Sequence, residues 1–552
     1  MKKIFSLTLA AVMAVVSMNV AQAQYKFGGL MMDHDGMMGN DMFTLSQVNF
    51  GFGTARSMSM AGAFTSLGAD MASMGINPAG LGMYRSNDFS FSPLMGFQNA
   101  ENNATSWGEN KQSRFAVSNI GVVFNLYENS KTSLVSVSMG LGYNRIADFN
   151  YRYGFTSQSG ASSAPYRSIA DAFSLMMGQS GLMPDNNGGL NYDFRDAYYW
   201  GGILAYNNYL LDVGEDEYGR FYTTADRLGV NAGVGHTANM QSRGSIGEYD
   251  VSFGLNFGSK LYLGFTWGIQ SVRWTRQMYY GEDYIYSSTP VYSDGVALKN
   301  PAQWMDYNQA VQVTGSGMNA KFGLIYRPWE ALRVGVAVHT PTHYVLERSY
   351  QAYMAVKHMT DILNPDGDTT PALEDYGENT WDFWSPARLM FGASYTFGRF
   401  AVVSVDYERD WYNGMRVSRV PFGFDLTKDD YRKEFTDNFK GSNTLRIGAE
   451  VKPLPNLALR AGYGVADGAL RKDESLYYNA PITKRTTCYS AGAGFALGAV
   501  TIDLAYQHLN NQQTEYLLYY AIDEMGIFDT ASPYYRTDLK RNYFTLSFGY
   551  KF

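Results

Sequence analysis

The side chains able to do chemistry are dispersed along this 552-residue chain. Two of its six histidines, His339 and His343, are four residues apart. On an extended strand that spacing is roughly 13 Å, which is too far for one metal ion, although a bend at Pro341 would bring the rings closer. A haem or metal role for this pair is therefore an alternative to a structural role. The sequence contains no Walker loop, no nucleophile elbow and no HExxH motif, so it predicts no enzyme, no metal site and no cofactor.

Charged residues on the polar face of alternating segments form a second group of candidates. Paired carboxylates can carry out acid–base catalysis, but charges of both signs that face a narrow lumen need one another as partners. We therefore interpret them as a network that holds an internal plug. The residues are Lys321, Arg333, Asp406, Glu408, Arg446, Glu450, Arg460 and Asp503.

These charges need strands that turn one face inward, and the sequence shows the corresponding period of two. At the C-terminus, from Tyr543 to Phe552, apolar side chains alternate with small or polar ones. A strand of this kind fits a barrel wall between lipid and a wet lumen. About fourteen segments follow the pattern, each at least as long as the ~9–11 residues that cross a bilayer at a tilt. They are 88–98, 113–127, 132–150, 245–258, 260–278, 312–327, 331–349, 385–397, 399–414, 440–452, 456–466, 483–497, 499–515 and 538–552.

The connections between these segments alternate strictly between short and long. Short links include Gly258-Ser259 and Gly398, whereas long links include 151–244 and 279–311. Outer-membrane barrels have short periplasmic turns and long outer loops, and a soluble β-sandwich does not require this asymmetry. The sequence therefore predicts an all-β, antiparallel transmembrane barrel over residues 88–552, which crosses the outer membrane of a Gram-negative bacterium many times.

The composition agrees with a membrane barrel and excludes other classes of protein. Charged residues make up 17% of the chain, below the ~25% of a typical soluble domain. The net charge of −7, with no basic cluster, predicts no nucleic-acid partner. The single cysteine, Cys488, excludes an intrachain disulfide framework.

The first 23 residues read as an export signal. Lys2 and Lys3 precede an apolar run over 4–20, and Ala21-Gln22-Ala23 is a small-x-small cleavage site. A short N-terminal anchor is the alternative. The sequence thus predicts a signal peptide over residues 1–23 and a mature chain that leaves the cytoplasm.

Residues 24–87 do not alternate and are dense in Gly, Ala, Ser and Met, above all from Gln47 to Ala63. Small residues permit compact turns and close packing, and Met offers adaptable apolar contact, so this segment suits a hatch that plugs the lumen. Its run GTARSMSMAGAFTSLGADMASMGINPAGL, with LRVGVAVHTPTHYVLE at 332–347 and NTLRIGAEVKPLPNLALRAGYG at 443–464, resembles the FadL/TodX family of outer-membrane transporters for long-chain fatty acids and other hydrophobic compounds. Asn77, Pro78 and Ala79 match the hatch motif of that family.

The resemblance implies passive uptake of a hydrophobic small molecule such as a fatty acid, without a cofactor or an energy source. The expected partners besides this ligand are outer-membrane lipids and the barrel-assembly machinery, which would engage the C-terminal strand ending at Phe552. A scaffold for protein secretion or surface attachment, and a haem-binding receptor, are alternative functions.

Ligand contact is expected in the hatch. Arg56 would meet a carboxylate headgroup, unless it forms an ion pair between plug and wall, and the apolar residues would contact the ligand, unless they pack the plug. The expected contacts are Phe50, Phe52, Arg56, Met58, Met60, Phe64 and Leu67.

Two outer links carry helical signals. Ser168 precedes a segment, 169–177, that Gly178 would end, and a second helix would run from Asp196 to Leu211. The apolar residues of these helices either pack against other loops or form a landing patch for an apolar ligand. Four tryptophans near strand ends read as interfacial anchors: Trp329, Trp381, Trp384 and Trp411.

Overall fold

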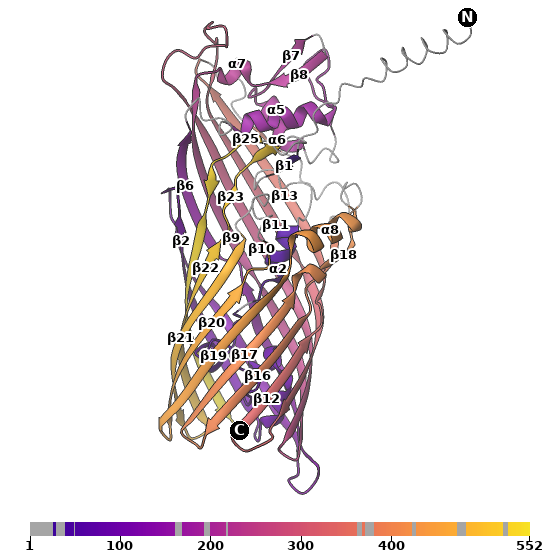
Figure 1. Cartoon of the computed structure of the whole chain (residues 1–552), viewed down its shortest axis with the longest axis vertical. Helices are drawn as coiled ribbons and strands as arrows, with labels where there is room; N and C mark the ends of the chain where they lie inside the picture. The colour runs from indigo at the N-terminus through magenta and orange to yellow at the C-terminus, as the bar shows by residue number, and fades with distance from the viewer. Residues whose placement is uncertain are drawn as a thin grey trace, which may run out of the picture.

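A computed structural model describes residues 26–28, 39–48, 50–159, 168–192, 199–216, 219–360, 367–369, 380–421, 427–471, 482–522 and 528–552. Within these residues, fourteen antiparallel strand paths close into one tall barrel (Figure 1). The first path pairs with the last, with Phe91 opposite Phe548, and this pairing completes the ring. The all-β fold and the strand number predicted from the sequence are confirmed. The predicted signal peptide lies outside the described residues.

Four of the fourteen paths are built from two strands that are separated by a short break. Those are β5 with β6, β12 with β13, β15 with β16, and β17 with β18. In chain order the wall consists of β2 (Asp88–Asn102), β4 (Lys111–Glu128), β5 (Leu134–Asp148), β6 (Tyr151–Ser159), β9 (Ala232–Phe257), β10 (Leu261–Tyr286), β11 (Ala302–Tyr326), β12 (Leu332–His339), β13 (His343–His358), β15 (Thr380–Trp384), β16 (Arg388–Phe397), β17 (Ala401–Trp411), β18 (Arg416–Arg419), β19 (Gly441–Leu454), β20 (Leu457–Asp467), β21 (Thr483–Leu497), β22 (Val500–Gln513) and β27 (Thr537–Lys551).

Short strands lie at the edges of the wall and above it. β3 (Thr105–Ser106) and β14 (Asp368–Thr369) join the barrel sheet, and β7 (Asp212–Asp216) pairs with β8 (Gly219–Thr223). The others form two small sheets: β1 (Lys26–Gly28), β23 (Tyr516–Leu517), β24 (Tyr520–Ile522), β25 (Phe528–Ala531) and β26 (Tyr534–Tyr535).

The two ends of the barrel differ as the sequence predicts. Tight turns, such as those between β9 and β10 and between β21 and β22, gather at the end that also holds the C-terminus (Figure 1). The long connections gather at the opposite end. An even number of paths brings both ends of the wall, Asp88 and Lys551, to the short-turn end, where the two residues pair. We call the short-turn end the periplasmic end and the other the outer end.

The lower part of the wall is apolar outside and polar inside. On β10, Phe265, Trp267 and Ile269 are exposed, whereas Thr266 between them is buried. The same alternation recurs around the ring, for example at Phe548 on β27. This apolar band is the surface that a bilayer would cover, because lipid cannot satisfy polar groups.

No helix among the described residues is long and apolar enough to cross a membrane.

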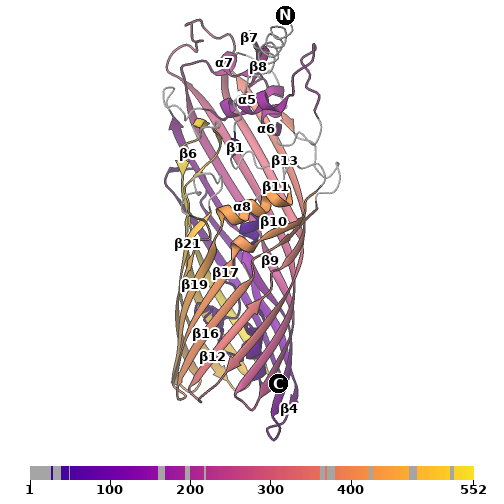
Figure 2. The same ribbon diagram turned by 45° about the vertical axis from the view of Figure 1, so that its right-hand side comes forward.

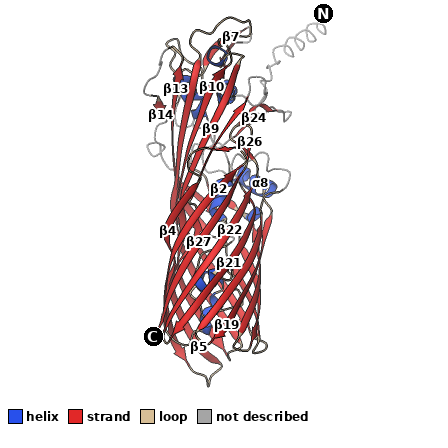
Figure 3. Cartoon of the chain, turned by 90° about the vertical axis from the view of Figure 1, so that its left-hand side faces the viewer, coloured by secondary structure: helices blue, strands red, loops and turns tan. Residues whose placement is uncertain are grey.

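Four strands rise well above the apolar band, and there the sequence-based boundaries were too short. Strand β9 begins at Ala232 and β11 at Ala302, ten or more residues before the predicted starts at 245 and 312, and β10 runs to Tyr286. Figures 2 and 3 show these strands, with β13, reaching past the rest of the barrel. Their outward residues are polar and their inward residues apolar, the reverse of the membrane pattern that the prediction followed.

The predicted outer helices exist with different ends. Helix α5 (Ile169–Ser180) begins where Ser168 accepts a hydrogen bond from the Ala170 amide, as expected, but it ends at Gly181, whose φ of 71° is a left-handed cap. Helix α6 (Trp200–Asn207) is shorter than the predicted 196–211. The predicted start at Asp196 lies outside the described residues, and Leu210 and Leu211 follow the helix rather than belong to it.

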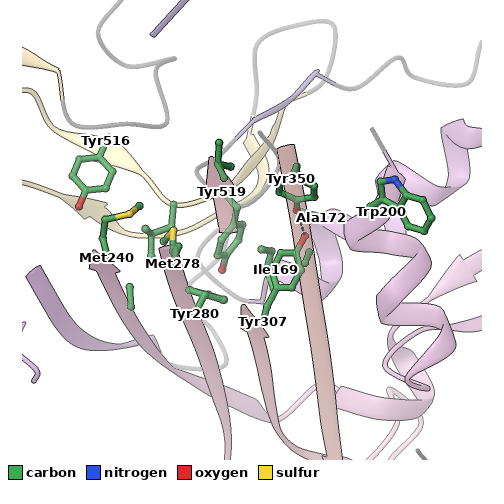
Figure 4. Close-up of a cluster of buried hydrophobic side chains, with 14 of the residues drawn as sticks. Ile169, Ala172, Trp200, Met240, Met278, Tyr280, Tyr307, Tyr350, Tyr516 and Tyr519 are labelled. Atoms are coloured by element: carbon green, nitrogen blue, oxygen red, sulfur yellow. Dashed lines mark hydrogen bonds between the residues drawn. The ribbon is translucent and has the colours of Figure 1, made fainter. Parts of the chain in front are cut away.

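The apolar residues of α5 and α6 pack inward instead of forming a landing patch. Trp200 and Leu204 of α6 are buried, as are Ile169 and Phe173 of α5. They join tyrosines of the tall wall, among them Tyr280, in one cluster that fills the outer end (Figure 4). Of the two interpretations weighed for these helices, packing against other elements is the one that the structure supports.

One further helix lies near the outer end and another lies near mid-height (Figure 1). Helix α7 (Ala225–Leu228) follows β8, and helix α8 (Lys428–Asn438) begins with a capping box between Thr427 and Asp430. Trp381 packs edge-on against Tyr431 of α8 and is fully buried, so its predicted role as an interfacial anchor is wrong. Trp329 and Trp411 are exposed, in keeping with such a role.

Candidate functional site

A segment ahead of the wall lies inside the barrel. It comprises residues 39–48 and 50–87, and we call it the luminal segment. Its elements are short: α2 (Gly39–Ser46), α3 (Ala55–Met58), α4 (Ser73–Ile76) and a 3-10 helix, η1 (Pro78–Met83). Serines, threonines and an aspartate supply the bonds that such short helices lack. Thr54 caps α3, and its hydroxyl donates to Asp70 over 2.8 Å.

The Asn-Pro-Ala triplet joins the luminal segment to the wall. The Asn77 side chain accepts a hydrogen bond from the Ala79 amide and so caps η1, while Pro78 occupies a first-turn position that needs no donor. The Asn77 amide group donates to the carbonyl of Thr65 at 2.6 Å, and to Leu324 and Val336 of the wall at 3.3 Å each. The fully buried Asn77 is therefore a tie between two turns of the luminal segment and strands β11 and β12.

Hydrogen bonds tether the luminal segment all around the ring. Side chains of the wall form hydrogen bonds with backbone groups of the segment, so many strands, rather than one, hold the segment in place. The tethers are Ser118 to Gly53, Ser136 to Gly82, Thr266 to Met74, His339 to Ile76, Asp406 to Thr65, Ser490 to Ala61 and Ser547 to Ala55.

Inward-facing glycines of the wall allow the backbone of the luminal segment to approach the strands closely. A Cβ on Gly264 would lie 2.1 Å from the carbonyl carbon of Pro78, and one on Gly462 would lie 2.4 Å from that of Met60. Both distances are far inside van der Waals contact. The Gly and Ser residues that alternate with apolar residues along the strands thus mark where wall and luminal segment touch.

Several of the inward charges are paired, as the sequence analysis expects, whereas Arg333 lies against the Met83 sulfur at 3.9 Å. Arg446 contacts Glu408 at 2.5 Å, and Arg460 contacts Glu450 at 2.6 Å and Asp503 at 2.5 Å. Lys321 bonds Glu248 and Asp250, two partners that sequence reasoning did not name. Asp406 instead accepts the Thr65 amide at 2.7 Å. These ion pairs join strands of the wall to one another, whereas Asp406 and the pair between Arg56 and Glu450 link the wall to the luminal segment.

Two chambers adjoin the luminal segment, and each encloses about 980 Å³ of space, part of it open to solvent. The first lies between 43–52 and strands β5, β21, β22 and β27. The second lies between 45–52, the stretch 57–76 of the same segment, and wall strands that include β5, β9 to β13, β16, β17 and β19. Val48, Phe52 and Ile146 line both, so the chambers adjoin. A third space of about 1040 Å³, the lower vestibule, lies on the periplasmic side and is lined by charged residues such as Asp88 and Lys551.

The structure distributes the predicted ligand contacts over three places. Phe50 and Phe52 line the first chamber, and Phe52 and Met58 line the second. Met60, Phe64 and Leu67 are buried together against Val402 of the wall. Arg56 faces the lower vestibule, where it pairs with Glu450 at 3.3 Å and lies over the Phe64 ring at 5.4 Å.

An arginine cluster that the sequence analysis missed borders the two chambers. Arg145 lines the second chamber and Arg541 the first, and with Arg114 both act electrostatically on the hydroxyl of Tyr543. Asp148 forms an ion pair with Arg114 at 3.3 Å. Within the described part of the chain, Arg145 and Arg541 have no carboxylate partner, and one buried guanidinium nitrogen of Arg145 has no hydrogen-bond partner at all. Three cations against one anion leave positive charge facing the chambers.

Sequence alone offered little signal for this cluster. Arg145 directly follows Asn144 at a β-bulge between β5 and β9, where the alternation that identified other inward charges is interrupted. A bulge re-aims a side chain.

His339 and His343 do not form a common site. His339 points into the lumen and bonds the Ile76 carbonyl at 2.9 Å, whereas His343 stacks on Trp384 with ring centroids 4.4 Å apart. Among the described residues, no group of three His, Cys, Asp or Glu side chains is placed to hold a metal ion.

Comparison with known proteins finds likeness in structure. No family model matches the chain, and no curated protein matches it in sequence. The structure of a Pseudomonas aeruginosa FadL homologue is 11% identical over 91% of this chain and 100% of that one, with a TM-score of 0.50. The toluene transporters TbuX of Ralstonia pickettii and TodX of P. putida are 16% and 14% identical over 91% of this chain and 99% of theirs, with TM-scores of 0.46 and 0.47.

These identities establish fold and nothing finer. The closed wall of fourteen paths, the apolar band and the segment folded inside define an outer-membrane β-barrel. Its fold is that of the FadL homologue, which confirms the resemblance drawn from the sequence.

Proposed function

We propose that this protein lets hydrophobic small molecules cross the outer membrane passively, and that residues 24–87 act as its hatch. The observation that carries the proposal is the position of the two chambers. The first adjoins residues 43–52 of the tethered luminal segment and the second lies between 45–52 and 57–76 of the same segment, with Phe50 lining the first chamber and Phe52 lining both. The names of TodX and TbuX as toluene transporters agree with this class of ligand.

The physical advantage of such a path is avoided hydration. Surface polysaccharide blocks apolar solutes, and a chamber that buries methylene groups offers each about 0.8 kcal/mol relative to water. The ligand must also leave, so binding should be moderate and release should follow a rearrangement of the luminal segment. The short helices and many small residues of that segment suit such a rearrangement.

A long-chain fatty acid fits the chambers better than an uncharged hydrocarbon. Arg145 and Arg541, which have no carboxylate partner among the described residues, bring positive charge to chambers whose lining mixes aromatic and aliphatic side chains with polar and charged ones. A carboxylate bonded to a guanidinium in a site shielded from water is a strong, charge-assisted pair. Arg145 thus takes the headgroup role that the sequence analysis gave to Arg56.

Uptake in cells tests the proposal. The host lacks its own fatty-acid uptake barrel and carries this protein, and the probe is radiolabelled oleate. The wild type should restore uptake, Phe52→Arg or deletion of 47–60 should abolish it, and the conservative control Phe52→Leu should keep most of it. If the folded wild-type barrel leaves oleate and toluene uptake unchanged while it purifies with a large complex, the scaffold alternative is correct.

A second comparison tests the charged end of the ligand. Arg145→Gln should weaken binding of oleate about tenfold or more and leave oleyl alcohol unchanged, because only the acid carries the anion. Arg333→Gln, a lumen arginine next to Met83, is the matched control. Equal loss for the acid and the alcohol would contradict a headgroup role for Arg145.

A further inference from the structure

The tall wall carries an outward polar face directly above the apolar band. It is formed by the outward side chains of β9, β10, β11 and β13, which pair in register with one another. From the band upward on β10 the outward residues change from Ile269 through Ser271 and Arg273 to Gln277 and Tyr279. Apolar, cationic and amide-bearing surfaces are therefore stacked in one continuous column.

Two arginines stand at the border between membrane and outside. Arg243 on β9 lies opposite Thr275, and Arg273 on β10 lies opposite Ser245, so the arginines are diagonal neighbours on one face, with Cα atoms roughly 7–8 Å apart. Both are exposed, and within the described residues neither has a hydrogen-bond or ion-pair partner for its side chain. The outward carboxylate in the row of Arg273 is Glu347, two strands away, which is roughly 10 Å. An anion bound between the two guanidinium groups would offset their mutual repulsion.

A row of free amides lies above the arginines. Gln241, Gln277 and Gln351 share one level of the wall, and Asn239 and Asn308 share the next. Together they line a shallow groove. None of these five side chains hydrogen-bonds to another described residue, so their donors and acceptors are available to a ligand.

Aromatic rings complete the groove. Tyr279 lies in it, and Trp107 stacks on Tyr279 with ring centroids 5.8 Å apart at 19°. Amides that bond hydroxyl groups, beside aromatic rings that pack on the apolar faces of sugar rings, form a surface of the kind that recognises saccharides.

We propose that this face binds one molecule of a phosphorylated outer-leaflet glycolipid. The acyl chains lie on the apolar band at Trp267 and Ile269, the phosphates lie between Arg243 and Arg273, and the sugars occupy the amide groove. Charge complementarity and continuity with the lipid-facing band carry the assignment, because the three parts of such a molecule follow one another in the same order as the three surfaces. The binding is independent of transport through the lumen.

Binding of defined lipids to the full-length protein in detergent micelles tests this proposal. The probes are rough lipopolysaccharide, lipid A without core sugars, and phosphatidylglycerol. Arg243→Gln/Arg273→Gln should bind lipopolysaccharide and lipid A at least tenfold more weakly, whereas Lys484→Gln/Arg485→Gln, an exposed basic pair on β21, should stay within twofold of the wild type. Heat-modifiable migration in gels checks that each variant is folded.

A second variant separates the sugars from the phosphates. Gln241→Ala/Gln277→Ala/Gln351→Ala should weaken lipopolysaccharide binding several-fold and leave lipid A unchanged. The proposal is overturned if the folded arginine variant binds lipopolysaccharide as the wild type does, if phosphatidylglycerol binds as tightly as lipopolysaccharide, or if the amide variant loses affinity for both glycolipids alike.

Discussion

The strongest mechanical prediction concerns Asn77, which ties the luminal segment to the wall. Its amide group has two N–H donors for the carbonyls of Thr65, Leu324 and Val336, and its oxygen accepts the Ala79 amide. Asn77→Ala removes the equivalent of three hydrogen bonds in a fully buried place. At about 0.5–1.5 kcal/mol each, the loss is about 1.5–4.5 kcal/mol. Since 1.4 kcal/mol is a factor of ten, the population of a displaced state of the luminal segment should rise roughly 10- to 1,600-fold.

Asn77→Asp should have a larger effect than Asn77→Ala. It keeps the shape of the side chain but turns an anion toward three carbonyl oxygens, so it adds repulsion to the loss of the donors. The control is Asn456→Ala, in an exposed turn at the periplasmic end, which should behave as the wild type.

Two assays report the displaced state. Purified variants in planar bilayers should show increased conductance, and cells expressing them should become sensitive to a hydrophilic antibiotic that ordinary porins exclude. Folded Asn77→Ala and Asn77→Asp barrels that are as impermeable as the wild type in both assays would show that Asn77 does not hold the luminal segment in place.

Three further predictions follow from other contacts. Gly264→Ala should displace η1 and raise conductance, because the new Cβ would lie 2.1 Å from the carbonyl carbon of Pro78. The control Gly51→Ala should leave conductance unchanged, because its Cβ would lie 3.7 Å from the nearest atom. Equal conductance of the two variants would refute close packing of η1 on the wall. In the part of β10 above the apolar band, burial raises the pKa of Glu282 from 4.5 to about 7. The folded state therefore binds this proton more tightly than the unfolded state does. In guanidinium unfolding, the free energy of unfolding of the wild type relative to Glu282→Gln should fall by about 1.4 kcal/mol per pH unit between pH 4.5 and 7. A free-energy difference that stays constant or rises with pH would contradict this prediction. Thr427→Ala removes the cap of α8 and should destabilise that helix by about 1 kcal/mol, which should appear as faster hydrogen exchange over 428–438. The control Thr436→Ala, within the helix, should leave the exchange rates unchanged. Unchanged exchange in both variants would mean that packing alone stabilises α8.

Strand identity in the membrane-spanning part of the wall could be predicted because lipid imposes a strict local rule. Residues such as Phe265 and Phe548 must be apolar, and their neighbours in sequence must face the lumen. Above the band this rule no longer applies, which is why Ala232 and Ala302 were not recognised as strand starts. The cap at Ser168 was also predictable, because a side chain that bonds a backbone amide two residues away needs no tertiary information.

The candidate site was only partly predictable. The segment that fills the lumen was recognisable by its small residues, but which of its side chains face a chamber was not. Met58 and Met60 are two residues apart in the same kind of sequence, yet one lines the second chamber and the other packs on the wall. A helical turn divides them, and its direction is set by the bonds to Ser490 and Ser547.

By itself, the sequence determined the periodicity of the strands, the alternation of short and long connections, and the small, close-packing character of the segment that enters the lumen, since each depends on residues near one another in the chain. The tertiary structure decided which charges have partners. Arg114, Arg145 and Arg541 meet because β27 closes on β2, a contact made across more than 400 residues of sequence. Ring closure fixes these distances, and no local pattern encodes which arginine the closed ring will leave without a carboxylate.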